Sequence, residues 1–226
     1  MRHAKLSNLE HLPEAGTFSP SEACLSRSSV LLPQGQYQII YADPPWSYAD
    51  QTCEGTMAKH YKGMPLSEIC YLPVEEIAAP DCVLFMWATY PMLPEALKVI
   101  SHWGFKYKSI AFQWIKLDPV SRTPFYGLGR WTRGNTEPCL IATRGNPHRV
   151  SDSVFQLIQE PRARHSKKPA IVRQRILELM GDLPRIELFA RKEDSLFDTD
   201  GFEGWDLWGN EIENGTIKEN ENEQEI

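Results

Sequence analysis

Short apolar runs and segments with a helical period alternate along the chain between about residue 37 and about residue 190. The runs 38–42 and 82–88 are almost continuously apolar, which is typical of strands buried on both faces of a sheet. Further strands are predicted at 107–116, with Phe112 and Trp114 in the core, and at 137–143, 154–159 and 185–190.

Three helices are predicted between these strands. Segment 66–79 has a helical pattern that Pro73 interrupts, and segment 94–103 stops at Gly104. Segment 169–180 is the clearest helix, because it has a proline in its first turn and Gly181 directly after its last residue. Strands that alternate with helices predict an α/β fold with a mostly parallel, doubly wound sheet.

The same pattern divides the chain into three parts. Residues 1–33 show no clear period and are interpreted as an irregular leader, 34–211 as a single domain, and 212–226 as an acidic, disordered tail. Two long loops, 47–65 and 117–136, interrupt the domain. Loops of this length in compact domains are usually functional, so we expect both to contact a substrate.

Composition limits the cellular location of the protein, the state of its cysteines and its metal binding. No apolar stretch reaches the length of a membrane span, and the N-terminus lacks a signal-peptide pattern, so a cytoplasmic protein without membrane contact is expected. Five cysteines occur without a Cys-x-x-Cys pair, which favours reduced thiols over disulfides or zinc. The sequence shows no constellation of metal ligands, and it leaves monomer and homodimer both open.

The net charge of −6 is unevenly distributed. Six glutamates and one lysine within residues 211–226 contribute −5 of it, whereas residues 122–175 hold eleven basic and three acidic side chains. Such a local basic excess suits a phosphate backbone. Within it, the segment Arg130-Trp131-Thr132-Arg133 interleaves cations with an aromatic ring, which favours nucleic-acid binding over a merely solvated surface.

The chemistry of the chain is concentrated in Asp43-Pro44-Pro45-Trp46, directly after the first predicted strand. Each proline fixes its own φ and keeps the preceding residue out of the helical region, so this corner is stiff. The Asp43 carboxylate and the Pro44 carbonyl can each accept one N–H of an adenine amine, and Trp46 can stack on the base. An Asp-Pro pair is often only a turn. A ligand role is favoured here, because the carboxyl end of a buried strand in an open α/β sheet is where ligands bind.

This tetrapeptide resembles the catalytic motif of the MT-A70-like adenine-N6 methyltransferases, which include bacterial and phage DNA methyltransferases and the catalytic subunit of the eukaryotic mRNA adenosine methyltransferase. The similarity continues in the family's order through Cys82–Trp87, Phe112–Lys116, Glu137–Ala142, Gly145–Pro147, Lys168-Pro169, Ile186–Arg191 and Gly204–Asn210. It implies a Rossmann-like methyltransferase fold in a circularly permuted motif order, with the donor-binding strand after the catalytic motif.

The resemblance also implies S-adenosylmethionine as the methyl donor and assigns residues to it. The implied cofactor contacts are Asp43, Lys168, Glu187, Phe189, Arg191, Asn210 and Glu211. Glu211 departs from the family pattern, because an amide is common at that position. The candidate nucleic-acid contacts are Tyr48, Lys59, Tyr61, Arg130, Trp131, Arg133, Glu137, Arg164 and Lys167.

Three functions compete at this point. The leading hypothesis is transfer of a methyl group to the N6 amine of adenine in DNA, with the target base outside the duplex stack. A second takes RNA as the acceptor, because the tetrapeptide serves either polymer. A third is a non-catalytic subunit that binds nucleic acid, against which stands the presence of Asp43, Trp46 and Lys168. Glutamine and cytosine amines are further possible acceptors, but Trp46 and the wider match favour adenine.

Overall fold

The computed structural model describes residues 32–47, 63–127, 129, 131–163, 167–190, 201–209, 212–213 and 216–217. By its internal contacts the chain divides into Met1–Leu31 and Leu32–Ile226. The first unit lies outside the described residues, and with it nearly all of the predicted leader. The fold below is that of the second unit.

A seven-stranded sheet forms the centre of the fold, in the strand order β5-β3-β4-β2-β1-β6-β7. Its strands are β1 (Tyr37–Ala42), β2 (Ala78–Trp87), β3 (Lys106–Leu117), β4 (Thr136–Arg144), β5 (Leu157–Pro161), β6 (Arg185–Leu188) and β7 (Asp206–Trp208). Only β4 pairs antiparallel with its neighbours, so six of the seven strands share one direction. The prediction of a mostly parallel α/β sheet is confirmed.

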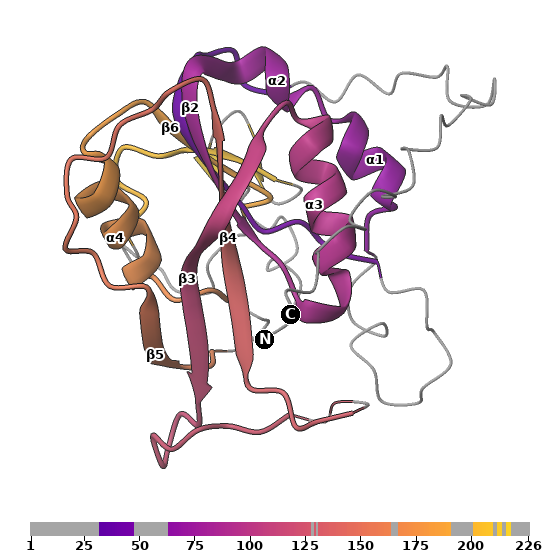
Figure 1. Cartoon of the computed structure of the whole chain (residues 1–226), viewed down its shortest axis with the longest axis vertical. Coiled ribbons are helices and arrows are strands. Elements are labelled where there is room, and N and C mark those ends of the chain that lie inside the picture. Colours follow the sequence, from indigo (N-terminus) through magenta and orange to yellow (C-terminus); the bar gives the residue numbers. More distant parts are fainter. Residues whose placement is uncertain are drawn as a thin grey trace, which may run out of the picture. The chain divides into compact units, whose positions relative to one another are not determined.

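Helices lie on both faces of this sheet (Figure 1). On one side are α1 (Leu66–Tyr71), α2 (Val74–Ile77) and α3 (Leu93–His102), preceded by the 3₁₀ turn Tyr90–Met92, and on the other is α4 (Ile171–Met180). Pro73 separates α1 from α2, as predicted from its missing N–H. Gly181 ends α4 with a φ of 84°, a left-handed conformation that glycine adopts without strain.

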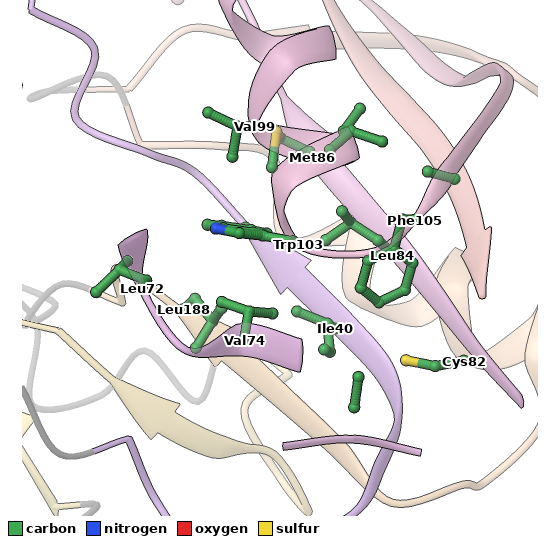
Figure 2. Close-up of a cluster of buried hydrophobic side chains, with 14 of the residues drawn as sticks. Ile40, Leu72, Val74, Cys82, Leu84, Met86, Val99, Trp103, Phe105 and Leu188 are labelled. Carbon is green, nitrogen blue, oxygen red and sulfur yellow. The ribbon is translucent and has the colours of Figure 1, made fainter. Parts of the chain in front are cut away.

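The alternation of side chains along β1 and β2 creates the two cores. Ile40 and Leu84 point into the core beneath α1, α2 and α3, where Trp103 is also fully buried (Figure 2). Ile39 and Phe85, one residue away along each strand, point into the core beneath α4. Both strands are therefore buried on both faces, which explains their continuous apolar runs in the sequence.

Some boundaries differ from the prediction. β2 begins at Ala78, inside the segment predicted as helix, and β5 covers Leu157–Pro161 rather than 154–159. β7 was not predicted, because three residues are too few to show an alternation. β8 (Ile212–Glu213) and β9 (Thr216–Ile217) form a small antiparallel pair within the segment interpreted as a tail.

Three further features bear on function. Cys70, Cys82 and Cys139 are free thiols, and the other two cysteines lie outside the described residues. Among the described residues, no helix is both long and apolar enough to cross a membrane, and no group of three or more acidic, histidine or cysteine side chains is arranged to hold a metal ion.

Candidate active site

The site begins at the carboxyl end of β1. This strand lies at the topological switch point, because the strands that follow it in the chain are added first on one side of it and later on the other. From β1 the chain builds β2, β4, β3 and β5 on one side, and later β6 and β7 on the other. Such a switch point is where open α/β sheets bind ligands. Ala42, the last residue of β1, is paired with Met86 of β2 and Leu188 of β6, so Asp43 lies between Trp87 and Phe189, the residues that follow these partners.

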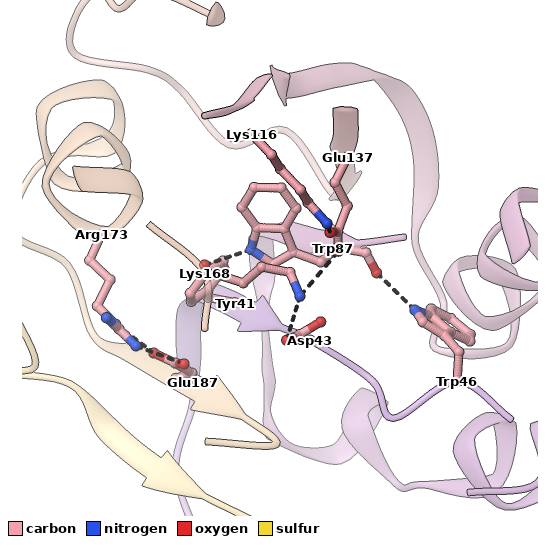
Figure 3. A network of polar contacts seen from close by, with 9 residues as sticks. All are labelled: Tyr41, Asp43, Trp46, Trp87, Lys116, Glu137, Lys168, Arg173 and Glu187. Atoms are coloured by element: carbon pink, nitrogen blue, oxygen red, sulfur yellow. Dashed lines mark hydrogen bonds and ion pairs between the residues drawn. The ribbon is translucent and has the colours of Figure 1, made fainter. Parts of the chain in front are cut away.

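The proline corner after β1 is closed by a tight turn. The backbone N–H of Trp46 donates to the carbonyl of Pro44 at 2.9 Å, and the N–H of Met64 donates to the carbonyl of Pro45 at 2.8 Å. The Pro44 carbonyl keeps a second lone pair for an incoming donor. The indole N–H of Trp46 donates to the backbone carbonyl of Trp87 at 3.2 Å (Figure 3). The Trp46 ring also packs against the apolar core. The orientation of Trp46 is thus fixed from two sides.

Lys168 connects the corner to a second carboxylate. Its Nζ lies 2.8 Å from Oδ2 of Asp43 and 3.1 Å from Oε1 of Glu137, with the Trp87 ring centroid 5.6 Å away (Figure 3). Burial, the largest single effect, lowers the pKa of Lys168, but the two carboxylates together raise that pKa above its ordinary value. The ammonium is therefore charged and held between two anions.

Glu137 is in turn shared between two lysines. Its Oε2 accepts from Nζ of Lys116 at 2.6 Å, while its Oε1 faces Lys168. Burial raises the pKa of Glu137, but Lys168 and Lys116 outweigh it, so the pKa is lowered overall. Lys116, Glu137, Lys168 and Asp43 form a row of alternating charges, called the charge row below, with Asp43 at its end (Figure 3).

A separate ion pair links β6 to α4. Nε of Arg173 lies 2.7 Å from Oε2 of Glu187 and Nη2 lies 2.9 Å from Oε1, a bidentate contact between two buried side chains (Figure 3). The Arg173 guanidinium also stacks over Phe202 at 3.8 Å. Burial raises the pKa of Glu187, only partly offset by Arg173, and the charges of Asp43 and Lys168 also act on Glu187. Glu187 therefore lies within electrostatic reach of the corner.

The carboxyl ends of β6 and β7 carry aromatic side chains beside Asp43. Phe189 has a φ of 63°, and its ring packs edge-on against Trp208 with centroids 5.5 Å apart. A left-handed conformation in a residue with a side chain costs about 1–3 kcal/mol and clusters at ligand sites. A carboxylate, an ammonium and aromatic faces at one edge of the sheet are the groups that suit a cationic, polar nucleoside donor.

The other predicted contacts are distributed unevenly. Trp131, 97% exposed, and exposed Arg133 lie on the loop between β3 and β4, and Lys167 precedes Lys168. Glu137 is buried with both oxygens on lysines, within the charge row, and its contact with nucleic acid stays a prediction. The predicted residues outside the described part of the chain are Tyr48, Lys59, Tyr61, Arg130, Arg164, Arg191, Asn210 and Glu211.

Sequence reasoning missed Lys116, Trp87 and Arg173 as parts of the site. Lys116 and Trp87 were included only as residues of matching strand segments. The sequence does contain a signal for Lys116. This lysine is the last residue of the predicted strand 107–116 and directly precedes the long basic loop 117–136, a position that favours a role in the site. No comparable signal marks Arg173, whose partner is fixed only by the packing of α4 on β6.

Together, the sheet and the corner define a class. A carboxylate-proline corner follows the strand at the switch point, and the aromatic cluster lies at the ends of strands that come later in the chain. This is a Rossmann-like methyltransferase fold with permuted motif order.

Comparison with known proteins gives the family. The MT-A70 family profile matches residues 37–211, which include all seven strands of the sheet and the whole charge row. A type II methyltransferase, M.MunI of Mycoplasma sp, is 35% identical over 83% of this chain and 82% of its own. The chain therefore belongs to the MT-A70 family of adenine-N6 methyltransferases.

Eukaryotic relatives match with lower identity. An N(6)-adenosine-methyltransferase MT-A70-like protein of Arabidopsis thaliana is 27% identical over 79% of this chain, and the N(6)-adenosine-methyltransferase catalytic subunit METTL3 of Homo sapiens is 26% identical over 70%. The matched parts are 24% and 26% of those proteins, so the chain corresponds to about a quarter of each.

Proposed function

We propose that this protein transfers a methyl group from S-adenosylmethionine to the N6 amine of adenine in DNA. The observation that carries the proposal is the Asp43-Pro44 corner, where a carboxylate and a backbone carbonyl end β1 side by side and Lys168 fixes one carboxylate oxygen at 2.8 Å. Two acceptors on a rigid turn match the two N–H groups of an exocyclic amine. The carboxyl end of β1, at the switch point, is the ligand-binding edge of the sheet.

The residues of the corner do their work by positioning. With Oδ2 of Asp43 on Lys168, the other carboxylate oxygen accepts one amine N–H, and the second lone pair of the Pro44 carbonyl accepts the other. Drawing both protons out of the base plane weakens conjugation of the nitrogen lone pair with the ring and aims it at the electrophile. S-Adenosylmethionine supplies the methyl group as that electrophile. The methylated nitrogen is cationic, and its acidic proton is already hydrogen-bonded to Asp43, so no base of unusual pKa is needed.

The proposed donor contacts are the groups that cluster at the ends of β1, β6 and β7. The Asp43 carboxylate suits a sulfonium, and Lys168 suits a carboxylate. Phe189, held in its left-handed conformation against Trp208, offers an aromatic face at the same edge. Both carboxylate oxygens of Glu187 are held by Arg173, and the contact expected between Glu187 and the donor stays a prediction. The contacts expected of Arg191, Asn210 and Glu211 stay predictions.

DNA is favoured as the acceptor by two observations. The likeness to a bacterial type II methyltransferase covers four fifths of both chains, and the bacterial and phage members of the family that this chain resembles are DNA methyltransferases. The β3–β4 loop also presents Trp131 and Arg133 to solvent, and these side chains suit a nucleobase and a phosphate. RNA is the second candidate, because the eukaryotic relatives are named N(6)-adenosine-methyltransferases.

The acceptor can be tested with matched oligonucleotides. The protein is incubated with donor labelled in its methyl group and with double-stranded DNA, single-stranded DNA or RNA of equivalent random sequence, and methyladenine is measured by mass spectrometry. Label in N6-methyladenine of DNA is expected. Label confined to RNA contradicts the DNA proposal, and label in another base contradicts the adenine assignment.

Trp131 provides a sharper test of the nucleic-acid surface. Replacing Trp131 with alanine is expected to weaken DNA binding by about 1–3 kcal/mol, the usual value of one aromatic stack on a base. Val120→Ala is a matched control, because Val120 is 90% exposed on the same loop and has no π face. Fluorescence anisotropy with a labelled duplex measures both. Equal affinities for the two variants contradict a stacking role for Trp131.

A further inference from the structure

Lys116 lies at the opposite end of the charge row from Asp43. It occupies the second-last position of β3, next to the start of β4, where Trp114 is paired with Glu137 and Ile115 with Thr136. β3 ends one residue later, at Leu117, and the basic loop then leads to Thr136, the first residue of β4. Lys116 thus stands between the loop and the catalytic corner, and its role in either is not evident from the motif.

The contacts of Lys116 fix its ammonium in place. Nζ lies 2.6 Å from Oε2 of Glu137 and 5.0 Å from the centroid of the Trp114 ring. That ring is itself held, because its indole N–H donates to the carbonyl of Glu160 on β5 at 2.8 Å. With its ammonium held in this way, Lys116 occupies one oxygen of Glu137 and leaves the other for Lys168.

The position of Lys168 depends on Lys116 and Lys168 each binding a different oxygen of Glu137. Its ammonium lies 2.8 Å from Asp43 and 3.1 Å from Glu137, so two carboxylates compete for one cation. Without the Lys116 charge, buried Glu137 has a single cationic partner in the charge row. A buried carboxylate with too little compensation draws its remaining cation closer. Lys168 then shifts toward Glu137 and away from Oδ2 of Asp43, and the Asp43 carboxylate is free to rotate.

We propose that Lys116 is a positioning residue of the methyl transfer: through Glu137 and Lys168 it holds the Asp43 carboxylate in the orientation that receives the adenine amine. The inference rests on the proposed function, because it assigns the free oxygen of Asp43 to the acceptor base. The competing role for a lysine beside a basic loop is a phosphate contact. The two roles differ in what they control, since positioning sets kcat and a phosphate contact sets affinity and its salt dependence.

The test replaces Lys116 with methionine, which keeps the length of the side chain and removes its charge. A displacement of about 1 Å at a reacting group can cost about a hundredfold in rate, so we expect kcat to fall by roughly tenfold to a hundredfold. The KM for the oligonucleotide and its salt dependence are expected to stay as in the wild type. Lys116→Arg, which keeps the charge, is expected to recover most of kcat. Lys108→Met is the matched control, because Lys108 is exposed on the same strand.

Four outcomes decide between the roles. A fall in kcat that Lys116→Arg repairs supports positioning. A raised KM with unchanged kcat and a salt slope lower by about one shows a phosphate contact and overturns the inference, as do kinetics identical to the wild type. Independently of activity, a crystal structure of Lys116→Met in which Lys168 still lies 2.8 Å from Asp43 also overturns it. A wild-type protein that methylates no adenine contradicts the proposed function instead, and the crystal structure then decides on Lys116 alone.

Discussion

The charge row and the Arg173–Glu187 pair are built from the same kinds of charged group, but they differ in how many oxygens of the carboxylate are bound by a cation. Both bring carboxylates and cations together at the central sheet; both members of the pair are buried, whereas Glu137 is the buried member of the row. In the pair, both oxygens of Glu187 are bound by one guanidinium, and the carboxylate side chain is 10% exposed. In the row, Lys168 binds only Oδ2 of Asp43, whose side chain is 22% exposed.

The difference separates a structural ion pair from a reactive one. A bidentate pair engages both oxygens of its carboxylate with one internal partner, and here it joins α4 to β6. A row of charges that stops at the edge of the sheet presents its last oxygen to whatever binds there. Removing charge from the row is therefore expected to change activity, and removing it from the pair is expected to change stability.

The largest expected effect is on activity, from Asp43→Asn. This substitution keeps the shape of the side chain but replaces one acceptor oxygen with a donor group, which repels an amine N–H. We expect kcat to fall by about a thousandfold or more, as when one preorganised electrostatic contact of a transition state is lost. Methyl transfer to a DNA duplex measures the effect. Asp182→Asn, at a side chain 91% exposed, serves as the control with unchanged turnover.

Turnover of Asp43→Asn close to that of the wild type contradicts the role of the corner. The unfolding free energy in urea is measured alongside, because Asp43 also pairs with Lys168. A loss of activity with a stability close to the wild-type value places the effect in the chemistry. A comparable loss of both removes the distinction between row and pair.

The next effect in size is on stability, from Arg173→Met. The change leaves Glu187 buried without its bidentate partner, and breaking a buried pair in this way costs about 3–5 kcal/mol. Denaturation in urea measures it. The double variant Arg173→Met/Glu187→Leu removes both charges and is expected to recover much of the loss, since apolar replacement of a whole buried pair is often neutral. A double variant as unstable as the single one indicates that lost packing over Phe202, rather than the stranded charge, causes the effect.

The sequence predicted Asp43, at the end of the charge row, as a catalytic residue, but it did not predict the Arg173–Glu187 ion pair. The reason is physical. Asp43 and the prolines act through local stiffness, and the buried strand before them has a continuous apolar run, so both can be predicted from neighbouring residues. The charge row joins residues 43, 116, 137 and 168, which meet only through strand order and register. The reversed direction of β4 places Glu137 at the same edge of the sheet as Asp43, and no local pattern specifies that reversal.

The left-handed backbone of Phe189 is a similar case. Phenylalanine has no preference for positive φ, and the sequence predicted a strand that continues to residue 190. The structure ends β6 at Leu188 and turns the chain at Phe189, where the ring meets Trp208. Tertiary contacts decided the conformation, so the resemblance to a family could mark the residue but could not give its geometry.

The smallest expected effect concerns acid stability, where the two carboxylates have opposite signs. The pKa of Glu137 is lowered by its lysines, so its contribution to stability is complete above the ordinary carboxyl pKa of about 4.3 and is lost as the pH falls through its lowered value. The pKa of Glu187 is raised by burial, so folding favours its protonated form. Its contribution grows as the pH falls through the raised value, and it is lost again as the pH rises.

Unfolding free energies measured in urea between about pH 6 and about pH 3.5 separate these terms. Glu137→Gln is expected to remove part of the acid-side loss, and Glu187→Gln is expected to remove an acid-side gain. Only the slopes against pH are compared, because each substitution also shifts stability at neutral pH. If both substitutions change the slope of unfolding free energy against pH in the same direction, the pKa of Glu137 is not governed by its lysines while that of Glu187 is governed by burial. That outcome also contradicts the distinction between the charge row and the Arg173–Glu187 pair.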